Sequence, residues 1–242
     1  MGLKAFPSLV NTVIITELLR SSAKYIKVVK MAELFSPLVP VRFYGVDTGI
    51  YIICAVIGLM ISYQAYKLYQ ISGKKQHMYL LTAFAILGVG FLTLTLTTGY
   101  TYFRYFVQGE IYQFDPLFGI DDVGFWVYFG ASFIGYALLA AMYTGEQAKP
   151  LIVPAIFVTA NYFSYVNIIL FFLIAFVAFR AATTHFSNKT KGSGRVMLSF
   201  SLVTLYHALL PFAAFSKVLY VAAHISLILG FGMLWRMLSK KE

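Results

Sequence analysis

The sequence predicts an all-α, polytopic membrane protein: a bundle of seven transmembrane helices preceded by an N-terminal amphipathic helix. Hydrophobic residues make up 60% of the 242 residues and charged residues only 12%, with a mean hydropathy of +0.78. Soluble domains usually contain about 25% charged residues. Apolar runs of roughly twenty residues, long enough to cross a hydrocarbon core of about 30 Å, recur along the chain. The 18 Tyr and 23 Phe suit the aromatic belts of membrane interfaces.

Residues 1–44 are predicted to form an amphipathic leader that lies in the membrane interface. Between residues 11 and 30, basic side chains recur at three- and four-residue spacing on one helix face, and apolar side chains occupy another. Pro37 and Pro40 end helical structure before the first span. A start at Met31 is the alternative, and it would remove most of this leader. The basic face holds Arg20, Lys24 and Lys27, and the apolar face holds Ile14, Ile15, Leu18, Ile26 and Val29.

Residues 45–242 are predicted to form one seven-helix bundle, because polar breaks divide them into apolar runs. The region from residue 150 to residue 180 is ambiguous. A single helix there would be too long for an untilted span, so we place a break near Asn161. The predicted spans cover about residues 47–69, 78–102, 123–143, 148–160, 162–182, 196–215 and 218–238.

Basic residues set the predicted orientation. With a break near Asn161, only Arg104 and Lys217 lie on one side of the membrane, apart from the leader. The positive-inside rule therefore places the N-terminus of the first span outside and the C-terminus in the cytoplasm of a multi-pass cell-membrane protein. The formal net charge of +10 reflects these short loops, so we expect a lipid bilayer and no nucleic acid as a partner. The cytoplasmic set is Lys67, Lys74, Lys75, Lys149, Arg180, Lys189, Lys191, Arg195, Arg236, Lys240 and Lys241.

Two histidines form the candidate cofactor site. His207 lies ten residues before Lys217 and His224 seven residues after it, so an antiparallel hairpin that turns at Ser216-Lys217 places both imidazoles at similar depth. Such a pair could ligate a b-type haem or a metal ion. In the preferred alternative, each imidazole hydrogen-bonds a hydroxyl or carbonyl inside the bundle, and a proton relay is the third alternative. The nearest candidate partners are Thr204, Tyr206, Tyr220 and Ser226.

An acidic, aromatic loop follows the second predicted span. Its side chains could recognise an external ligand, cation or partner protein. The alternative is a solvated loop beside an aromatic belt, with two of its acids at a helix start that favours negative charge. The candidate recognition residues are Glu110, Asp115, Asp121, Asp122 and Trp126.

Catalytic motifs are absent from the sequence: it contains no HExxH, no GxSxG and no P-loop. Cys54, Arg104 and a histidine are similar to the Cys/Arg/His set of archaeosortase-type transpeptidases. However, Cys54 stands in the run ICAVIG, without the small polar residues that flank the nucleophile in that family. A single cysteine also excludes an intrachain disulfide. We therefore expect a protein that is not an enzyme.

The run AYKLYQISGKKQHMYLLTAFAILGVGF, together with YHALL and HISLILGFGMLW near the end of the chain, resembles a wider group of membrane proteins. It is similar to the seven-helix modules of uncharacterised archaeal proteins and to the seven-helix sensor regions of some histidine kinases. This resemblance covers residues 47–238 and implies a sensing or accessory role. Because the chain ends at Glu242 without an output domain, we expect any signal to pass through another membrane protein.

Two functions follow as expectations. The first is a non-enzymatic integral membrane protein that acts as a receptor-like sensor or as an accessory subunit of a membrane complex. The second is an electron-transfer subunit that binds a b-type haem or a metal ion through His207 and His224.

Overall fold

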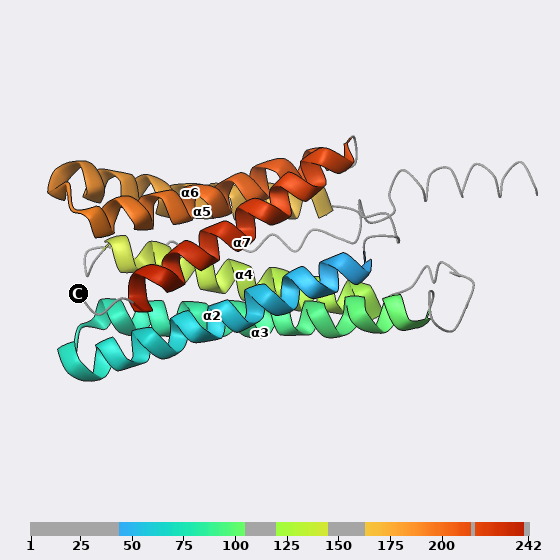
Figure 1. Cartoon of the computed structure of the whole chain (residues 1–242), viewed down its shortest axis with the longest axis horizontal. Coiled ribbons are helices and arrows are strands. Elements are labelled where there is room, and N and C mark those ends of the chain that lie inside the picture. The colour runs from blue at the N-terminus through green and yellow to red at the C-terminus, as the bar shows by residue number, and fades with distance from the viewer. Residues whose placement is uncertain (1–43, 105–119, 145–162, 214–215, 240–242) are drawn as a thin grey trace, which may run out of the picture. The chain divides into compact units, whose positions relative to one another are not determined.

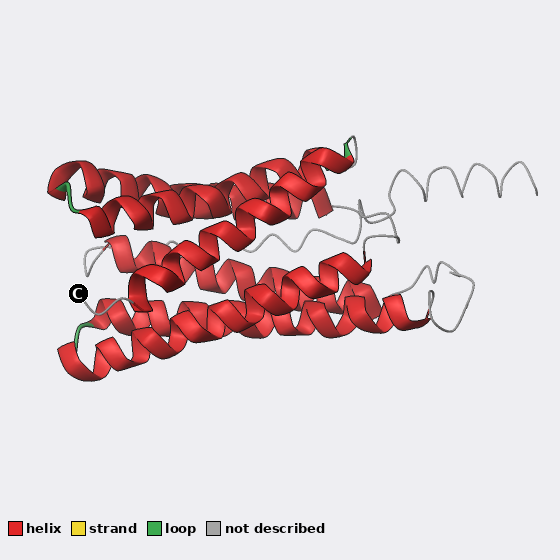
Figure 2. Ribbon diagram, in the orientation of Figure 1, coloured by secondary structure: helices red, strands yellow, loops and turns green. Residues whose placement is uncertain are grey.

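The computed structural model describes residues 44–104, 120–144, 163–213 and 216–239, and these ranges contain helices and no strands (Figure 2). The chain divides into two compact units, residues 1–38 and 39–242, and all described residues belong to the second. Its helices are α2 (Tyr44–Ser72), α3 (Lys75–Tyr102), α4 (Ile120–Thr144), α5 (Phe163–Asn188), α6 (Lys191–Leu209), the 3₁₀ helix η4 (Leu210–Phe212) and α7 (Lys217–Ser239).

The six α-helices of the described ranges are all long and apolar enough to cross a membrane, which is compatible with an integral membrane protein. The prediction of an all-helical protein is confirmed for the described residues, and six of the predicted spans largely coincide with these helices. The predicted span 162–182 begins one residue before α5, and the predicted span 196–215 extends past α6 and η4. The predicted fourth span, residues 148–160, lies outside the described residues. The same holds for the predicted amphipathic leader up to residue 43. Both therefore stay predictions.

Each of the six α-helices contacts the next one along the chain, and the last helix, α7, also contacts the first, α2. We call α2, α3 and α4 the first trio, and α5, α6 and α7 the second trio. The end at which α2 begins is the Asp47 end, and the end with the turn between α2 and α3 is the Gly73 end. In Figure 1 the Asp47 end lies on the right and the Gly73 end on the left.

Both hairpin turns at the Gly73 end use a residue with left-handed backbone to end a helix. Gly73 has a φ of 63°, and its N–H donates to the Tyr69 carbonyl at 2.8 Å. Lys189 has a φ of 48°, and its N–H donates to the His185 carbonyl at 2.7 Å. A left-handed residue after the last helical turn satisfies a free carbonyl and reverses the chain.

Helices α4 and α5 run in the same direction, unlike the hairpin pairs α2–α3 and α5–α6 (Figure 1). Near the C-terminal ends of both helices, Arg180 Nη2 donates to the Tyr143 carbonyl at 3.2 Å. The chain therefore leaves α4 at the Gly73 end and begins α5 at the Asp47 end.

Small residues allow α3 and α4 to approach closely. A Cβ added at Gly90 would lie 2.6 Å from the Cβ of Ala131, and one added at Gly135 would lie 2.7 Å from Cγ of Leu87. Both distances are shorter than real carbon contacts, so the two helices touch along this line. Close backbone approach is the usual way in which membrane helices gain packing energy.

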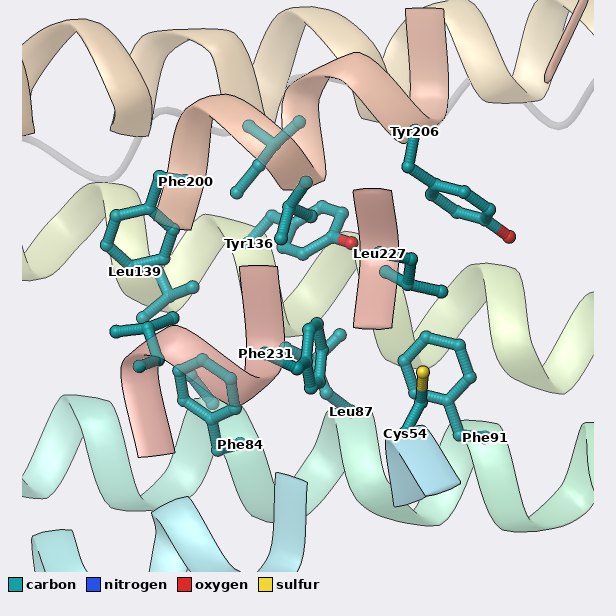
Figure 3. Packing of buried hydrophobic residues seen from close by; sticks show 14 of the residues in the cluster. Cys54, Phe84, Leu87, Phe91, Tyr136, Leu139, Phe200, Tyr206, Leu227 and Phe231 are labelled. Carbon is teal, nitrogen blue, oxygen red and sulfur yellow. The ribbon is translucent and has the colours of Figure 1, made fainter. Parts of the chain in front are cut away.

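Toward the Gly73 end, the core is apolar and aromatic (Figure 3). The Phe231 ring of α7 packs edge-on against Phe84 and Phe91 of α3, with ring centroids 5.6 Å apart in each pair. Two buried serines interrupt this region, and both are satisfied by backbone. Ser62 Oγ donates to the Leu81 carbonyl at 3.0 Å, and Ser199 Oγ donates to the Arg195 carbonyl at 2.8 Å. Other members of this core are Leu87, Leu139, Ile174, Val177 and Phe200.

Candidate functional site

The other buried polar side chains lie nearer the Asp47 end or at mid-bundle, which makes this part of the core chemically different from the apolar part. The α3 threonines among them bond mainly within their own helix. Thr95 donates to the Phe91 carbonyl at 2.8 Å and Thr98 donates to the Leu94 carbonyl at 2.7 Å. The remaining buried polar groups come from five helices and include Asp47, Ser132, Asn167, His207, His224 and five tyrosines, Tyr51, Tyr128, Tyr136, Tyr206 and Tyr220.

Asp47, Tyr51, Tyr220 and His224 form what we call the Asp47 cluster, which joins α2 to α7. The carboxyl of Asp47 is only 1% exposed and accepts a hydrogen bond from the Tyr220 hydroxyl. Oδ1 of the same carboxyl lies 3.9 Å from Nε2 of His224. The Tyr51 hydroxyl lies 3.5 Å from that nitrogen, and the Tyr220 ring packs against the imidazole with centroids 4.3 Å apart.

The backbone determines which nitrogen of His224 carries the proton. Nδ1 lies 2.9 Å from the carbonyl oxygen of Tyr220, and a carbonyl can only accept. Nδ1 must therefore be the donor, and in the neutral imidazole Nε2 then holds a lone pair. That lone pair faces the Tyr51 hydroxyl, which can donate to it, and the carboxyl of Asp47.

Tyr136, Asn167 and His207 form a second group, the His207 cluster, which joins α4, α5 and α6. His207 is fully buried. Its Nε2 lies 2.9 Å from the Tyr136 hydroxyl, and its Nδ1 lies 3.4 Å from Oδ1 of Asn167. With the amide oriented this way, Nδ1 donates to Asn167 and Nε2 accepts from Tyr136. The two clusters thus share one pattern, a tyrosine hydroxyl facing Nε2 of a buried histidine.

Tyr206 connects the two clusters. Its ring packs against His207 with centroids 4.8 Å apart and against His224 with centroids 5.6 Å apart. Beside it, the hydroxyls of Tyr128 and Ser132 are buried without a hydrogen-bond partner among the described residues. Figure 3 shows Tyr136, Tyr206 and Cys54 in the interior among these helices.

The structure thus brings His207 and His224 into one buried region on adjacent helices. Their nitrogens, however, face protein groups. Tyr136 and Asn167 face those of His207, while Tyr51 and the Tyr220 backbone face those of His224. Six-coordinate haem needs one free nitrogen from each ring, so this donor set does not fit a haem without breaking these contacts. The geometry favours the alternative of hydrogen-bonded histidines, with Tyr220 as the one partner the sequence identified.

The described residues contain no group of three or more His, Cys, Asp or Glu side chains that could hold a metal ion. Cys54 is fully buried, and Arg104 lies over the Tyr100 ring, 5.7 Å from its centroid. The other two histidines lie at the hairpin turns. Nδ1 of His77 is 2.7 Å from the Ser72 hydroxyl, and Nδ1 of His185 is 2.9 Å from the Ser193 hydroxyl.

The candidate recognition residues of the acidic loop are only partly described. Glu110 and Asp115 lie outside the described residues. Asp121 and Asp122 belong to the first turn of α4. Trp126 is half-buried and packs edge-on against Phe129, with ring centroids 5.9 Å apart. This contact suits a position within an aromatic belt.

Asp47 is the functional candidate that sequence reasoning missed, because it was taken only as the first residue of a span. A signal was present. Asp47 and Tyr51 are four residues apart, as are Tyr220 and His224, so each pair lies on one helix face. Ser132 and Tyr136 show the same spacing after Tyr128.

Comparison with protein-family models, curated protein sequences and solved structures found no match to this chain.

Proposed function

We propose that this chain is a non-enzymatic, multi-pass membrane protein that acts as a receptor-like sensor, with the buried polar region near its Asp47 end as the input site. An accessory subunit of a membrane complex is the related role in which a partner protein, and not a ligand, acts on this region. The resemblance to archaeal seven-helix modules and to kinase sensor regions points the same way. In either role the partner at the Gly73 end would be another membrane protein.

One observation carries the proposal: among the described residues, the hydrogen bonds that join the first and second trios lie mainly in the polar region. The Asp47 cluster joins α2 to α7, and the Tyr136–His207 bond joins α4 to α6. Contacts of this kind can exchange partners, whereas close-packed apolar side chains have one arrangement. A ligand that competes for these hydrogen bonds could shift one trio against the other. Binding sites between the helices of a bundle are common.

The proposed orientation has seven crossings, with the Asp47 end outside and the Gly73 end in the cytoplasm. The parallel α4 and α5 support an additional crossing between Thr144 and Phe163. The basic residues also support it, because the Asp47 end of the described chain has only Arg104 and Lys217. Toward the Gly73 end lie Lys67, Lys74, Lys75, Arg180, Lys189, Lys191, Arg195 and Arg236.

Reporter fusions test this orientation. A reporter inserted near Lys189 or fused after Glu242 should be cytoplasmic, because both positions follow the basic Gly73 end. A reporter inserted near Gln113 should be external. Enzymatic activity of a compartment-specific reporter pair measures each position in intact cells. A cytoplasmic signal at Gln113 would overturn the proposed orientation.

The sensor role requires that a change at the Asp47 end alter the Gly73 end. Cys54 is the single cysteine of the chain and is buried, so a Cys54→Ser background allows spin labels at Lys74→Cys and Asn188→Cys, both exposed. These positions report the separation of the two trios by pulsed dipolar spectroscopy. We expect Asp47→Ala, which removes the partner of Tyr220, to shift or broaden the distance distribution. This is because the trios then lose a contact that orients them.

The matched control is Tyr63→Phe. Tyr63 is 55% exposed, and its ring, which lies under Lys67, is kept in the variant. Its distance distribution should equal that of the parent. An unchanged distribution in folded Asp47→Ala would contradict the sensor role and leave an accessory role.

A further inference from the structure

We propose that Asp47 and His224 form a proton-binding site, in which one shared proton joins α2 to α7 at the Asp47 end. This deepens the proposed function by naming a proton as the ligand of the input site. Its signalling role rests on that function, but the site itself does not. The site needs no other ligand, because Asp47 of α2 and His224 of α7 already face each other across the contact between these two helices, which we call the α2–α7 seam.

In the unprotonated pair, Asp47 and His224 face each other with two acceptor atoms. Because the Tyr220 carbonyl requires Nδ1 of His224 to be a donor, Nε2 of the neutral ring is an acceptor. It lies 3.9 Å from Oδ1 of Asp47, which is also an acceptor when ionised. Two acceptors facing each other repel. One added proton turns the pair into an attraction, either as N–H⁺ toward carboxylate or as carboxylic O–H toward nitrogen.

The net charge of the buried Asp47–His224 pair depends on this proton. Asp47 and His224 are each about 1% exposed, and no Lys or Arg lies within ion-pair distance of Asp47 among the described residues. Without the proton, the pair carries one net negative charge in the apolar interior. With the proton, its net charge is zero. Burying an uncompensated charge is far more costly than burying a neutral pair, so the closed arrangement of α2 and α7 favours the proton-bound form.

The groups around the pair do not remove this need for a proton. Among the described residues, the titratable groups that face it are Tyr51 of α2, Tyr220 of α7 and Tyr206 of α6, all uncharged at neutral pH. On the α3 side, the ring nearest Tyr51 is Phe91, at 6.2 Å between centroids. The 3₁₀ helix η4, which contacts α7, consists of Leu210, Pro211 and Phe212 and has no titratable side chain. The basic side chains of this end point elsewhere, since Lys217 is exposed and Arg104 lies over Tyr100.

The proposal predicts that the separation between the starts of α2 and α7 increases as the pH rises. Proton loss at alkaline pH should leave a net charge and two opposed acceptors at the α2–α7 seam, so the two helix starts should separate. Asp47→Asn should hold the seam closed at all pH values, because the amide N–H can donate to Nε2 while its oxygen accepts from Tyr220. Asp47→Ala should leave the seam open at all pH values, because neither bond can form.

Spin labels at Val46→Cys and Val218→Cys measure this separation in full-length Cys54→Ser protein in lipid nanodiscs. Val46 and Val218 are 56% and 74% exposed and lie at the starts of α2 and α7. We expect a single short distance at acid and neutral pH and a longer, broader distribution at alkaline pH. His207→Gln is the matched control, because it alters an equally buried histidine that does not face a carboxylate, and it should keep the pH dependence. Distances independent of pH in the parent, or still pH-dependent in Asp47→Asn, would overturn the proposal.

A second measurement observes the protonation of His224 directly. The chain has four histidines, so ring ¹⁵N spectra can be assigned with one His→Gln variant for each. His224 should show a protonated Nδ1 at alkaline pH and should titrate in the parent, and this titration should be lost in Asp47→Asn. An Nε2–H tautomer would overturn the proposal. A pH-dependent Asp47 end with an unmoved Gly73 end would preserve the proton site and contradict only the sensor role.

Discussion

Phe231→Ala is expected to lower the free energy of unfolding by about 3 kcal/mol, at the low end of the range for buried phenylalanines. Phe231 is 1% exposed and packs edge-on against Phe84 and Phe91. These contacts join α7 of the second trio to α3 of the first. Removing the ring leaves a cavity between helices, and lipid cannot fill an enclosed space. Equilibrium unfolding in mixed micelles measures the loss.

Phe172→Ala provides the matched control. Phe172 lies on α5 and is 66% exposed, so in a membrane its ring would contact lipid in both the folded bundle and the separated helices. Its loss should be within about 0.5 kcal/mol of the parent, as for exposed positions in general. Equal losses for the two variants would show that Phe231 does not join the trios in the way described here.

His207→Ala is expected to cost about 1–3 kcal/mol. The imidazole is fully buried and faces both Tyr136 and Asn167, so its removal leaves a hydroxyl and an amide without this partner. This exceeds the mean of about 0.6 kcal/mol for intramembrane hydrogen bonds, because two groups lose a partner at once. His77→Ala is the control, since His77 bonds Ser72 at an exposed turn and should change little.

The same variants test haem binding. Protein expressed with ample haem should be colourless, because ring nitrogens of both His207 and His224 already face protein groups. A Soret band that disappears in both His207→Ala and His224→Ala would contradict the hydrogen-bonded assignment and would identify the pair as axial ligands. A band that survives in either variant would exclude six-coordinate binding by this pair.

Hydropathy was sufficient to predict most of the architecture, because a membrane-spanning helix needs about twenty apolar residues whatever it packs against. The depth of His207 and His224 followed from counting residues along a hairpin. Their partners did not, because Tyr136 and Asn167 lie 71 and 40 residues from His207 and depend on which faces α4 and α5 present. Tyrosines in particular were ambiguous. A tyrosine in an apolar run suits both the interface and the interior, and only packing shows that Tyr51, Tyr206 and Tyr220 are buried.

Asp47 was missed for a related reason. An acid at the start of a span is usually solvated, and the last two predicted spans contain no lysine or arginine near this depth that would pair with it. Its burial depends on a tyrosine and a histidine from the last helix, which is a tertiary arrangement. Two glycines of α4 show the same dependence on packing: Gly135 meets α3, whereas nothing lies within 4 Å of a Cβ added at Gly130.

The bond between Tyr220 and Asp47 also sets the order in which the protein can mature during synthesis. The two residues are 173 positions apart, so α2 emerges from the ribosome long before α7 exists. Within each trio the packing joins helices that are neighbours in sequence, and such local contacts form early. The first trio would therefore wait in the membrane with an unpartnered acid, which is costly there. Arrival of α7 removes that cost, so a truncated chain would remain recognisable to membrane quality control as unfinished.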